Sequence, residues 1–182
     1  MNKNLKLLIY LCAFVLLVFA AILVYDYLAP KYEPVEVPDE ESELQKMPEI
    51  TFYDSDNDPH TISGFSGKPA VINIWATWCG YCVREMPYFE VEYMAYGDRV
   101  SFIMLNATDG QHETKQKVQE FIAHNKYTFP VYYDFDDNIS SLGIQGYPTT
   151  IFIDADGYIT KVVTGAMSKN SLYVAVQELL NG

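Results

Sequence analysis

The fold is decided by residues 70–82, which read AVINIWATWCGYC. The first seven, Ala70–Ala76, are almost all apolar, as is typical of a strand buried on both faces of a sheet. Cys79 and Cys82 follow at once, and residues 82–96 have a helical pattern. The stretch therefore predicts a buried strand that ends in a Cys-x-x-Cys motif, which in turn opens a helix.

A Cys-x-x-Cys pair at the start of a helix is suited to redox chemistry. Two cysteines three residues apart close almost no loop, so their disulfide would crosslink the fold poorly. The unpaired N–H groups and partial positive charge of a helix N-terminus stabilise a thiolate and lower its pKa. We expect Cys79 to be the exposed attacking thiolate and Cys82 to be the more buried thiol that resolves the mixed disulfide.

Metal binding is an alternative use of the same pair. A Cys-x-x-Cys motif can begin a zinc site, but that site needs two further ligands. The chain has no second Cys-x-x-Cys and no His-x₃-His motif, and its third cysteine, Cys12, lies in an apolar segment. We therefore predict no metal ligands, and a metal-binding or copper-delivery protein stays a remote alternative.

Strands and helices alternate along the rest of the chain, which indicates right-handed parallel crossovers. The dipeptide Asp156–Gly157 predicts a tight hairpin, which adds antiparallel strands. The fold class is therefore α/β, with a mixed central sheet flanked by helices on both faces. Strands are expected at Glu49–Tyr53, Thr61–Phe65, Val100–Asn106, Phe129–Tyr133, Thr149–Asp154 and Tyr158–Val163, and further helices at Glu113–Lys126, Asp137–Leu142 and 169–180.

The N-terminal segment has the features of a transmembrane anchor. Lys3 and Lys6 precede an uncharged run over residues 7–25, which would span roughly 28 Å as a helix, close to the thickness of a bilayer core. This run is longer than the apolar region of a typical signal peptide, so we expect it to stay uncleaved. The positive-inside rule places residues 1–6 in the cytoplasm and the bulk of the chain outside it.

Residues 26–46 are expected to form an acidic, proline-containing tether, because this composition favours an extended and solvated chain. The folded domain is expected at 47–182. Of the net charge of −12, −9 comes from eleven acidic residues against two lysines between Asp26 and Asp58. The chain lacks the excess of basic residues that nucleic-acid binding requires.

The stretch Asn73–Cys82, with Pro87 five residues further on, resembles the active-site motif of the thioredoxin superfamily. Residues 146–149, which read GYPT, resemble the cis-proline loop of that superfamily. Together with the predicted anchor, the chain looks like the membrane-anchored TlpA/ResA-like branch, which includes the cytochrome c maturation reductases. The resemblance covers about residues 47–182. It implies a thioredoxin-like fold and a thiol–disulfide oxidoreductase with no cofactor beyond its redox-active pair.

The resemblance also implies roles for the neighbours of the pair. Tyr147 and Pro148 would be joined by a cis peptide bond and would bind an incoming substrate peptide. Trp78 would border the site as an apolar platform for substrate. Gly80 and Tyr81, which lie between the cysteines, would tune the redox potential.

Proton handling departs from the thioredoxin pattern. Thioredoxins place a buried aspartate six residues before the first cysteine, where this chain has Asn73, which cannot ionise. The resemblance to ResA-like proteins offers Glu85 instead, one helical turn after Cys82. Partial burial would raise the pKa of Glu85 and let it accept and return the Cys82 proton.

The leading functional hypothesis is a reductase of disulfides in exported proteins. The resemblance suggests the heme-site cysteines of apocytochrome c as substrate, and a membrane dithiol carrier of the CcdA/DsbD type as electron donor. An oxidase that installs disulfides and a general thiol-redox partner are the alternatives. The dipeptide Gly80–Tyr81 is compatible with either direction of electron flow, because such dipeptides tune the potential over a wide range.

Overall fold

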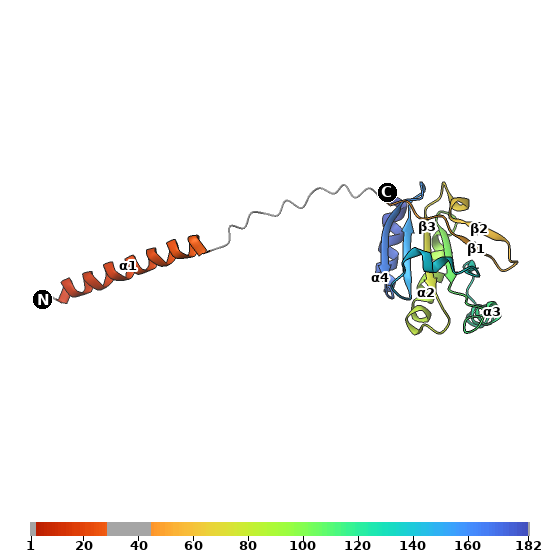
Figure 1. Cartoon of the computed structure of the whole chain (residues 1–182), viewed down its shortest axis with the longest axis horizontal. Helices are drawn as coiled ribbons and strands as arrows, with labels where there is room; N and C mark the ends of the chain where they lie inside the picture. The colour runs from red at the N-terminus through yellow and green to blue at the C-terminus, as the bar shows by residue number, and fades with distance from the viewer. Residues whose placement is uncertain (1–2, 29–44, 182) are drawn as a thin grey trace. The chain divides into compact units, whose positions relative to one another are not determined.

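The computed structural model describes residues 3–28 and 45–181 (Figure 1). The chain divides into two units, Met1–Glu41 and Ser42–Gly182. The first unit contains helix α1, Lys3–Leu28, which includes the predicted span. Within the described part of the chain, no helix has both the length and the apolar character that crossing a membrane requires. Most of the predicted tether, residues 29–44, lies outside the described residues.

The second unit is built on a mixed seven-stranded sheet, as predicted. The strands lie in the order β2-β1-β5-β4-β3-β6-β7. β4 pairs in parallel with both β3 and β5, whereas β6, β7, β1 and β2 pair antiparallel with their neighbours. The strands are β1 Thr51–Tyr53, β2 Pro59–Thr61, β3 Ala70–Trp75, β4 Ser101–Asn106, β5 Val131–Tyr133, β6 Thr149–Ile153 and β7 Ile159–Thr164.

Alternation along β3 divides the core into two clusters, because successive side chains of a strand point to opposite faces. Val71 and Trp75 belong to the cluster packed by the three α-helices of this unit. Figure 1 shows α4 beside one end of the sheet and α3 beside the other. These helices are α2 Gly80–Tyr96, α3 Lys115–Asn125 and α4 Lys169–Asn181.

The opposite face of the sheet is covered by short 3₁₀ helices instead of α-helices. Ile72 and Ile74 of β3 lie in this second cluster, together with Ile62 of η1 and Ile139 of η2. The prediction of helices on both faces therefore needs a correction, since the second face carries only single-turn helices and loop residues. The two elements are η1 Ile62–Phe65 and η2 Asn138–Leu142.

The predicted strand at Thr61–Phe65 is wrong beyond its first residue. β2 ends at Thr61, and Ile62–Phe65 form η1. The Glu49 carboxylate accepts hydrogen bonds from the Ser63 N–H at 3.1 Å and the Ser63 hydroxyl at 2.7 Å, and these bonds hold the segment in a turn. Because Glu49 lies fourteen residues from Ser63, the local sequence pattern could not predict these hydrogen bonds.

Candidate active site

The two cysteines lie where β3 passes into α2. Cys79 is the N-cap of α2, and its Sγ accepts a hydrogen bond of 3.1 Å from the Cys82 N–H. The pair is joined in a disulfide, with 5.2 Å between the Cα atoms. Cys82 is fully buried, whereas Cys79 keeps 7% of its surface exposed. Cys79 is thus the less buried of the two residues, as predicted, but it is not the exposed residue that was expected from the sequence.

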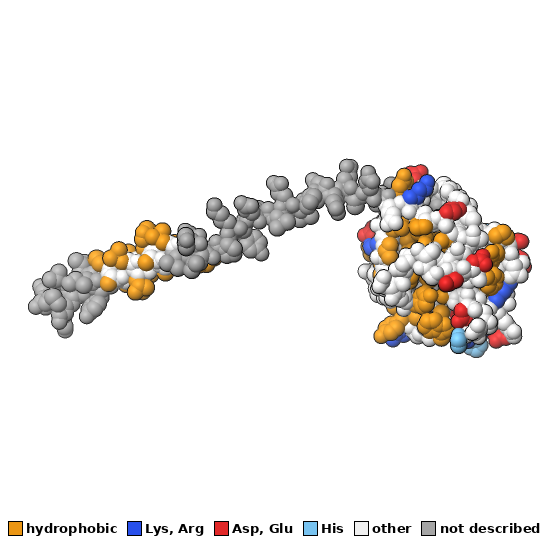
Figure 2. Space-filling view, viewed as in Figure 1, with side chains coloured by type: hydrophobic (Ala, Val, Ile, Leu, Met, Phe, Trp, Pro, Cys, Tyr) orange, Lys and Arg blue, Asp and Glu red, His pale blue; other side chains and the backbone are white. Residues whose placement is uncertain are grey.

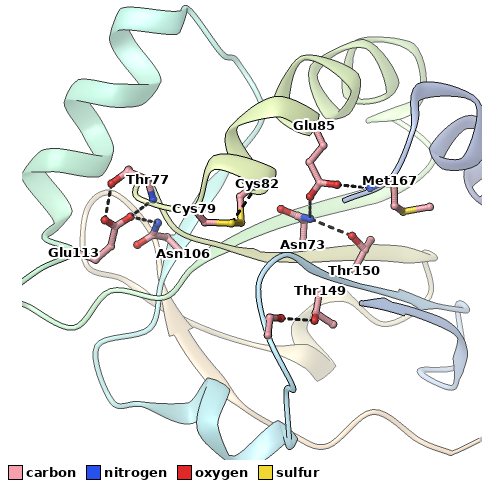
Figure 3. The surroundings of a disulfide bond; sticks show 11 residues. Asn73, Thr77, Cys79, Cys82, Glu85, Asn106, Glu113, Thr149, Thr150 and Met167 are labelled. Carbon is pink, nitrogen blue, oxygen red and sulfur yellow. Dashed lines mark hydrogen bonds between the residues drawn. A yellow bond between two sulfur atoms is a disulfide. The ribbon is translucent and has the colours of Figure 1, made fainter. Parts of the chain in front are cut away.

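The turn before the pair is held by Glu113, a residue that no sequence motif marked. Its carboxylate accepts hydrogen bonds of 2.6 Å from the Thr77 N–H and from the Thr77 hydroxyl, and one of 2.8 Å from Asn106 Nδ2 (Figure 3). Glu113 is fully buried, and the Lys117 ammonium lies 3.8 Å from its Oε2. Three donors and a nearby cation offset the cost of burying this carboxylate.

Glu85 lies on the buried side of α2, with 1% of its surface exposed. Its Oε1 accepts a hydrogen bond of 2.9 Å from Asn73 Nδ2, and its Oε2 accepts one of 2.7 Å from the Met167 N–H. Burial raises the pKa of Glu85 to about 7, although both hydrogen bonds oppose this rise. The predicted proton carrier is therefore buried beside the pair and titrates near neutral pH.

Asn73 connects Glu85 to the neighbouring strand. Asn73 and Thr150 stand opposite each other in the β3–β6 register, and Asn73 Nδ2 donates a second hydrogen bond, of 3.1 Å, to the Thr150 hydroxyl. Asn73 Oδ1 is buried and has no hydrogen-bond partner among the described residues. In Figure 3 this oxygen is on the side of the amide that faces the disulfide.

The cis-proline loop lies against the residue that precedes the pair. The Tyr147–Pro148 peptide bond is cis, as predicted. The ring of Tyr147 meets that of Trp78 edge to face, with 5.8 Å between the ring centroids. Trp78 nevertheless keeps 58% of its surface exposed. The two segments therefore form one continuous surface beside Cys79.

A cavity of about 320 Å³ opens next to this surface. Trp78, Tyr147 and Phe135 give it aromatic walls, and the carboxylates of Asp109, Asp134 and Asp137 also line it. Hydrophobic side chains reach the surface elsewhere too, and Figure 2 shows them in patches on the visible face of the folded unit. The cavity that Trp78 lines thus combines aromatic and acidic residues next to the pair.

Two of these carboxylates are fixed by backbone N–H groups. Asp109 Oδ1 accepts from the N–H groups of Gln111, His112 and Glu113, and these bonds lower the pKa of Asp109 to about 2. Asp134 accepts from two N–H groups at the start of η2, each at 2.8 Å. Burial nonetheless raises the pKa of Asp134.

The dipeptide between the cysteines faces solvent. Gly80 is exposed, and Tyr81 keeps 62% of its surface exposed. The Arg84 guanidinium lies 4.4 Å from the centroid of the Tyr81 ring, a cation–π contact one turn along α2. Among the described residues, no group of three His, Cys, Asp or Glu side chains is arranged to hold a metal ion.

Comparison with known proteins agrees with this geometry. The family model described as Redoxin matches residues 43–179. The chain belongs to the Redoxin family. Within it, the chain is similar to the thiol-disulfide oxidoreductase ResA of Geobacillus thermodenitrificans, with 32% identity over 127 residues, 69% of this chain and 71% of the relative. This Redoxin protein is a thiol–disulfide oxidoreductase of the ResA type, with Cys79 and Cys82 as its Cys-x-x-Cys pair.

Solved structures place the Redoxin unit among thioredoxin-like folds. StoA from Bacillus subtilis is 25% identical, with a TM-score of 0.62 over 71% of this chain and 96% of that one. The pneumococcal exposed lipoprotein thioredoxin Etrx1 is 23% identical, with a TM-score of 0.63 over 72% of this chain and 100% of that one. The predicted thioredoxin-like fold is thereby confirmed.

Proposed function

We propose that this thiol–disulfide oxidoreductase reduces disulfides in exported proteins, with the heme-site cysteines of an apocytochrome c as the candidate substrate. The observation that carries the proposal is the placement of Cys79 at the N-terminus of α2, nearer to solvent than Cys82 and beside the Tyr147–Pro148 loop. The similarity to proteins named ResA supports it.

In the proposed reaction, the Cys79 thiolate attacks one sulfur of the substrate disulfide, and a mixed disulfide forms as the other substrate sulfur leaves as a thiolate. Cys82 then loses its proton to Glu85 and attacks Cys79. The second substrate thiolate leaves, and the Cys79–Cys82 disulfide closes. Two electrons have passed to the substrate, and a membrane dithiol carrier of the CcdA/DsbD type supplies two further electrons that reduce the Cys79–Cys82 disulfide as the carrier itself becomes a disulfide.

The remaining site residues have binding and tuning roles in this proposal. Trp78, Tyr147 and Pro148 would hold the substrate chain across Cys79, and the neighbouring cavity supports this by offering room for a substrate side chain. Gly80 and Tyr81 would set the potential of the pair. The solvent exposure of Tyr81 supports contact with the protein partner as well.

The proposal also places the enzyme at the cell membrane, anchored once, with the Redoxin unit outside the cytoplasm. The uncharged run at residues 7–25 after two lysines supports this arrangement. Cell fractionation with a carbonate wash tests it. The full chain should stay with the membrane, and a chain that starts at residue 42 should not. Release of the full chain by the wash, or a mature N-terminus beyond residue 28, would contradict the anchor.

The direction of electron flow is tested by redox titration against glutathione. A reductase should have a potential in the range of thioredoxin, about −270 mV. A potential near −120 mV, at the strongly oxidising end, would support the oxidase alternative and overturn the reductase.

Glu85→Gln tests the role of Glu85 as proton carrier. We expect this substitution to change both the redox potential and the pH profile of thiol reactivity. An unchanged pH profile would show that Glu85 does not take part in the mechanism.

The substrate is tested by trapping. A Cys82→Ser chain should hold its substrate on Cys79 as a mixed disulfide, whereas the matched Cys79→Ser chain should not. Both variants carry Cys12→Ser, because Cys12 is a free thiol outside the active-site pair. Recovery of a c-type cytochrome would support maturation, whereas a broad set of exported proteins would favour a general thiol-redox partner.

A further inference from the structure

Asn73 has an unused hydrogen-bond acceptor at the redox centre. Its side chain is fully buried, and both protons of Nδ2 are engaged, one by Glu85 and one by Thr150. Its Oδ1 has no partner among the described residues. A buried carbonyl oxygen without a donor is destabilising, and such groups are rare in folded proteins. The unpaired Oδ1 beside the cysteines therefore indicates that its hydrogen-bond donor is present in another redox state of the enzyme.

The orientation of the Asn73 amide follows from its neighbours. When Glu85 is ionised, a flipped amide would bring Oδ1 against the carboxylate, acceptor against acceptor, and would lose the 2.9 Å bond from Nδ2. The hydrogen-bonding pattern therefore fixes Nδ2 toward Glu85 and Thr150. Oδ1 is left on the side that faces the disulfide in Figure 3.

Reduction supplies the missing donor. The disulfide carries no proton on sulfur, but two electrons and two protons convert it into two thiols. Cys82 is fully buried, so its new S–H group has no water to bond. We propose that Asn73 Oδ1 accepts the hydrogen bond of the Cys82 S–H group in the dithiol enzyme. The proposal deepens the proposed function, since it rests on Cys79 and Cys82 cycling between disulfide and dithiol.

Asn73 then hydrogen-bonds both Cys82 and Glu85 without carrying a proton itself, so the Cys82 S–H must leave Oδ1 before it passes its proton to Glu85. Its carbonyl oxygen accepts from the thiol while its N–H group donates to the carboxylate, and hydrogen bonds in such a chain strengthen one another. The amide favours the state in which Cys82 is protonated and Glu85 is ionised. It therefore stabilises the reduced enzyme relative to the oxidised one, in which Oδ1 stays unpaired.

The direct test is the infrared S–H stretching band of Cys82. In the full chain with Cys12→Ser and Cys79→Ser, Cys82 is the single thiol. Its band should lie at the lower frequency of a hydrogen-bonded thiol, and it should move to the free-thiol position when Asn73→Leu is added. A band at the free position before that addition would overturn the proposal, and this outcome does not depend on how the Asn73 variant folds.

A second measurement uses the equilibrium with glutathione in chains that keep both active-site cysteines. Asn73→Leu should shift the equilibrium toward the disulfide by about tenfold, which is about 30 mV for two electrons. Thr150→Val removes the other partner of Nδ2 but leaves Oδ1, so it should shift the equilibrium less than threefold. Equal shifts in the two variants would contradict a specific role for Oδ1. Neither measurement uses an exported substrate, so a wrong substrate or direction would leave both readouts unchanged.

Discussion

Glu113 and Thr77 are joined by two hydrogen bonds of 2.6 Å, one from the Thr77 N–H and one from its hydroxyl. Thr77 stands two residues before Cys79, whereas Glu113 belongs to the loop that follows β4. The same carboxylate also bonds Asn106 at the end of β4. The approach to the cysteines is therefore fixed by a residue from the neighbouring crossover.

We expect Glu113→Gln to lower the free energy of unfolding of the oxidised enzyme by about 2–4 kcal/mol, because hydrogen bonds to a buried charge are lost and an amide N–H₂ meets the same donors. Urea denaturation measures this change. Glu178→Gln is the matched control: Glu178 is exposed and paired with Lys161 at the surface, so its loss should cost less than about 1 kcal/mol. Similar small effects of both substitutions would contradict the role of Glu113.

The raised pKa of Glu85 predicts a stability that depends on pH. The neutral acid is favoured in the folded protein, so this contribution is complete below the ordinary pKa of 4.5 and is lost as the pH rises through about 7. The wild type should lose up to about 3 kcal/mol from this group between pH 4.5 and pH 8. Unfolding measured at several pH values should show a flatter profile for Glu85→Gln. Parallel profiles for the two proteins would argue against the raised pKa.

Trp78 should matter more for protein substrates than for stability. Its exposed ring contacts Tyr147 at the cavity, and aromatic pairs of this kind contribute about 0.5–1.5 kcal/mol. We expect Trp78→Ala to lower kcat/KM for a protein disulfide about tenfold and to leave a small-molecule disulfide within twofold. Tyr173→Ala, at an exposed position on α4, is the control and should change neither. An equal loss on both substrates would indicate damage to the cysteine pair instead.

Packing of α4 should account for a large part of the stability of the unit. Leu172 is fully buried in the cluster that α4 shares with α2 and the sheet. Leu172→Ala should lower the free energy of unfolding by about 2–5 kcal/mol through the cavity it leaves. Val174→Ala, at a position with 41% of the surface exposed, should cost less than about 1 kcal/mol. Denaturant unfolding of the two variants side by side measures the difference.

Much of the fold could be predicted from the sequence, because its strongest signals are local. The apolar run at Ala70–Ala76 predicted a central strand, and β3 occupies Ala70–Trp75 with both neighbours paired. The cysteines were expected to open a helix, and α2 begins at Gly80. The cis peptide bond before Pro148 was predicted only from the resemblance to the thioredoxin superfamily, since a single proline does not by itself indicate a cis bond.

Features that depend on distant contacts escaped prediction. The turn at Ile62–Phe65 is held by Glu49. The short helix expected at Asp137–Leu142 is present as η2, but no α-helix of the described residues packs in the cluster on this second face of the sheet. Nothing in the sequence distinguished Glu113 from the other glutamates, so its hydrogen bonds to Thr77 and Asn106 could not be predicted. The fixed position of Glu85 likewise required Met167, which is 82 residues away in the chain.

Successive side chains of β3 point to opposite faces of the sheet, and this alternation restricts which deletions in the gene the fold can tolerate. Asn73 faces the helical cluster and the reactive centre, while Ile72 and Ile74 on either side of it face the opposite core. Deleting a single codon between Ala70 and Asn73 would exchange these faces, so that an amide would enter an aliphatic core and an isoleucine would meet Glu85. Surface loops can gain or lose residues at little cost, but deletion of one codon in this strand should unfold the unit.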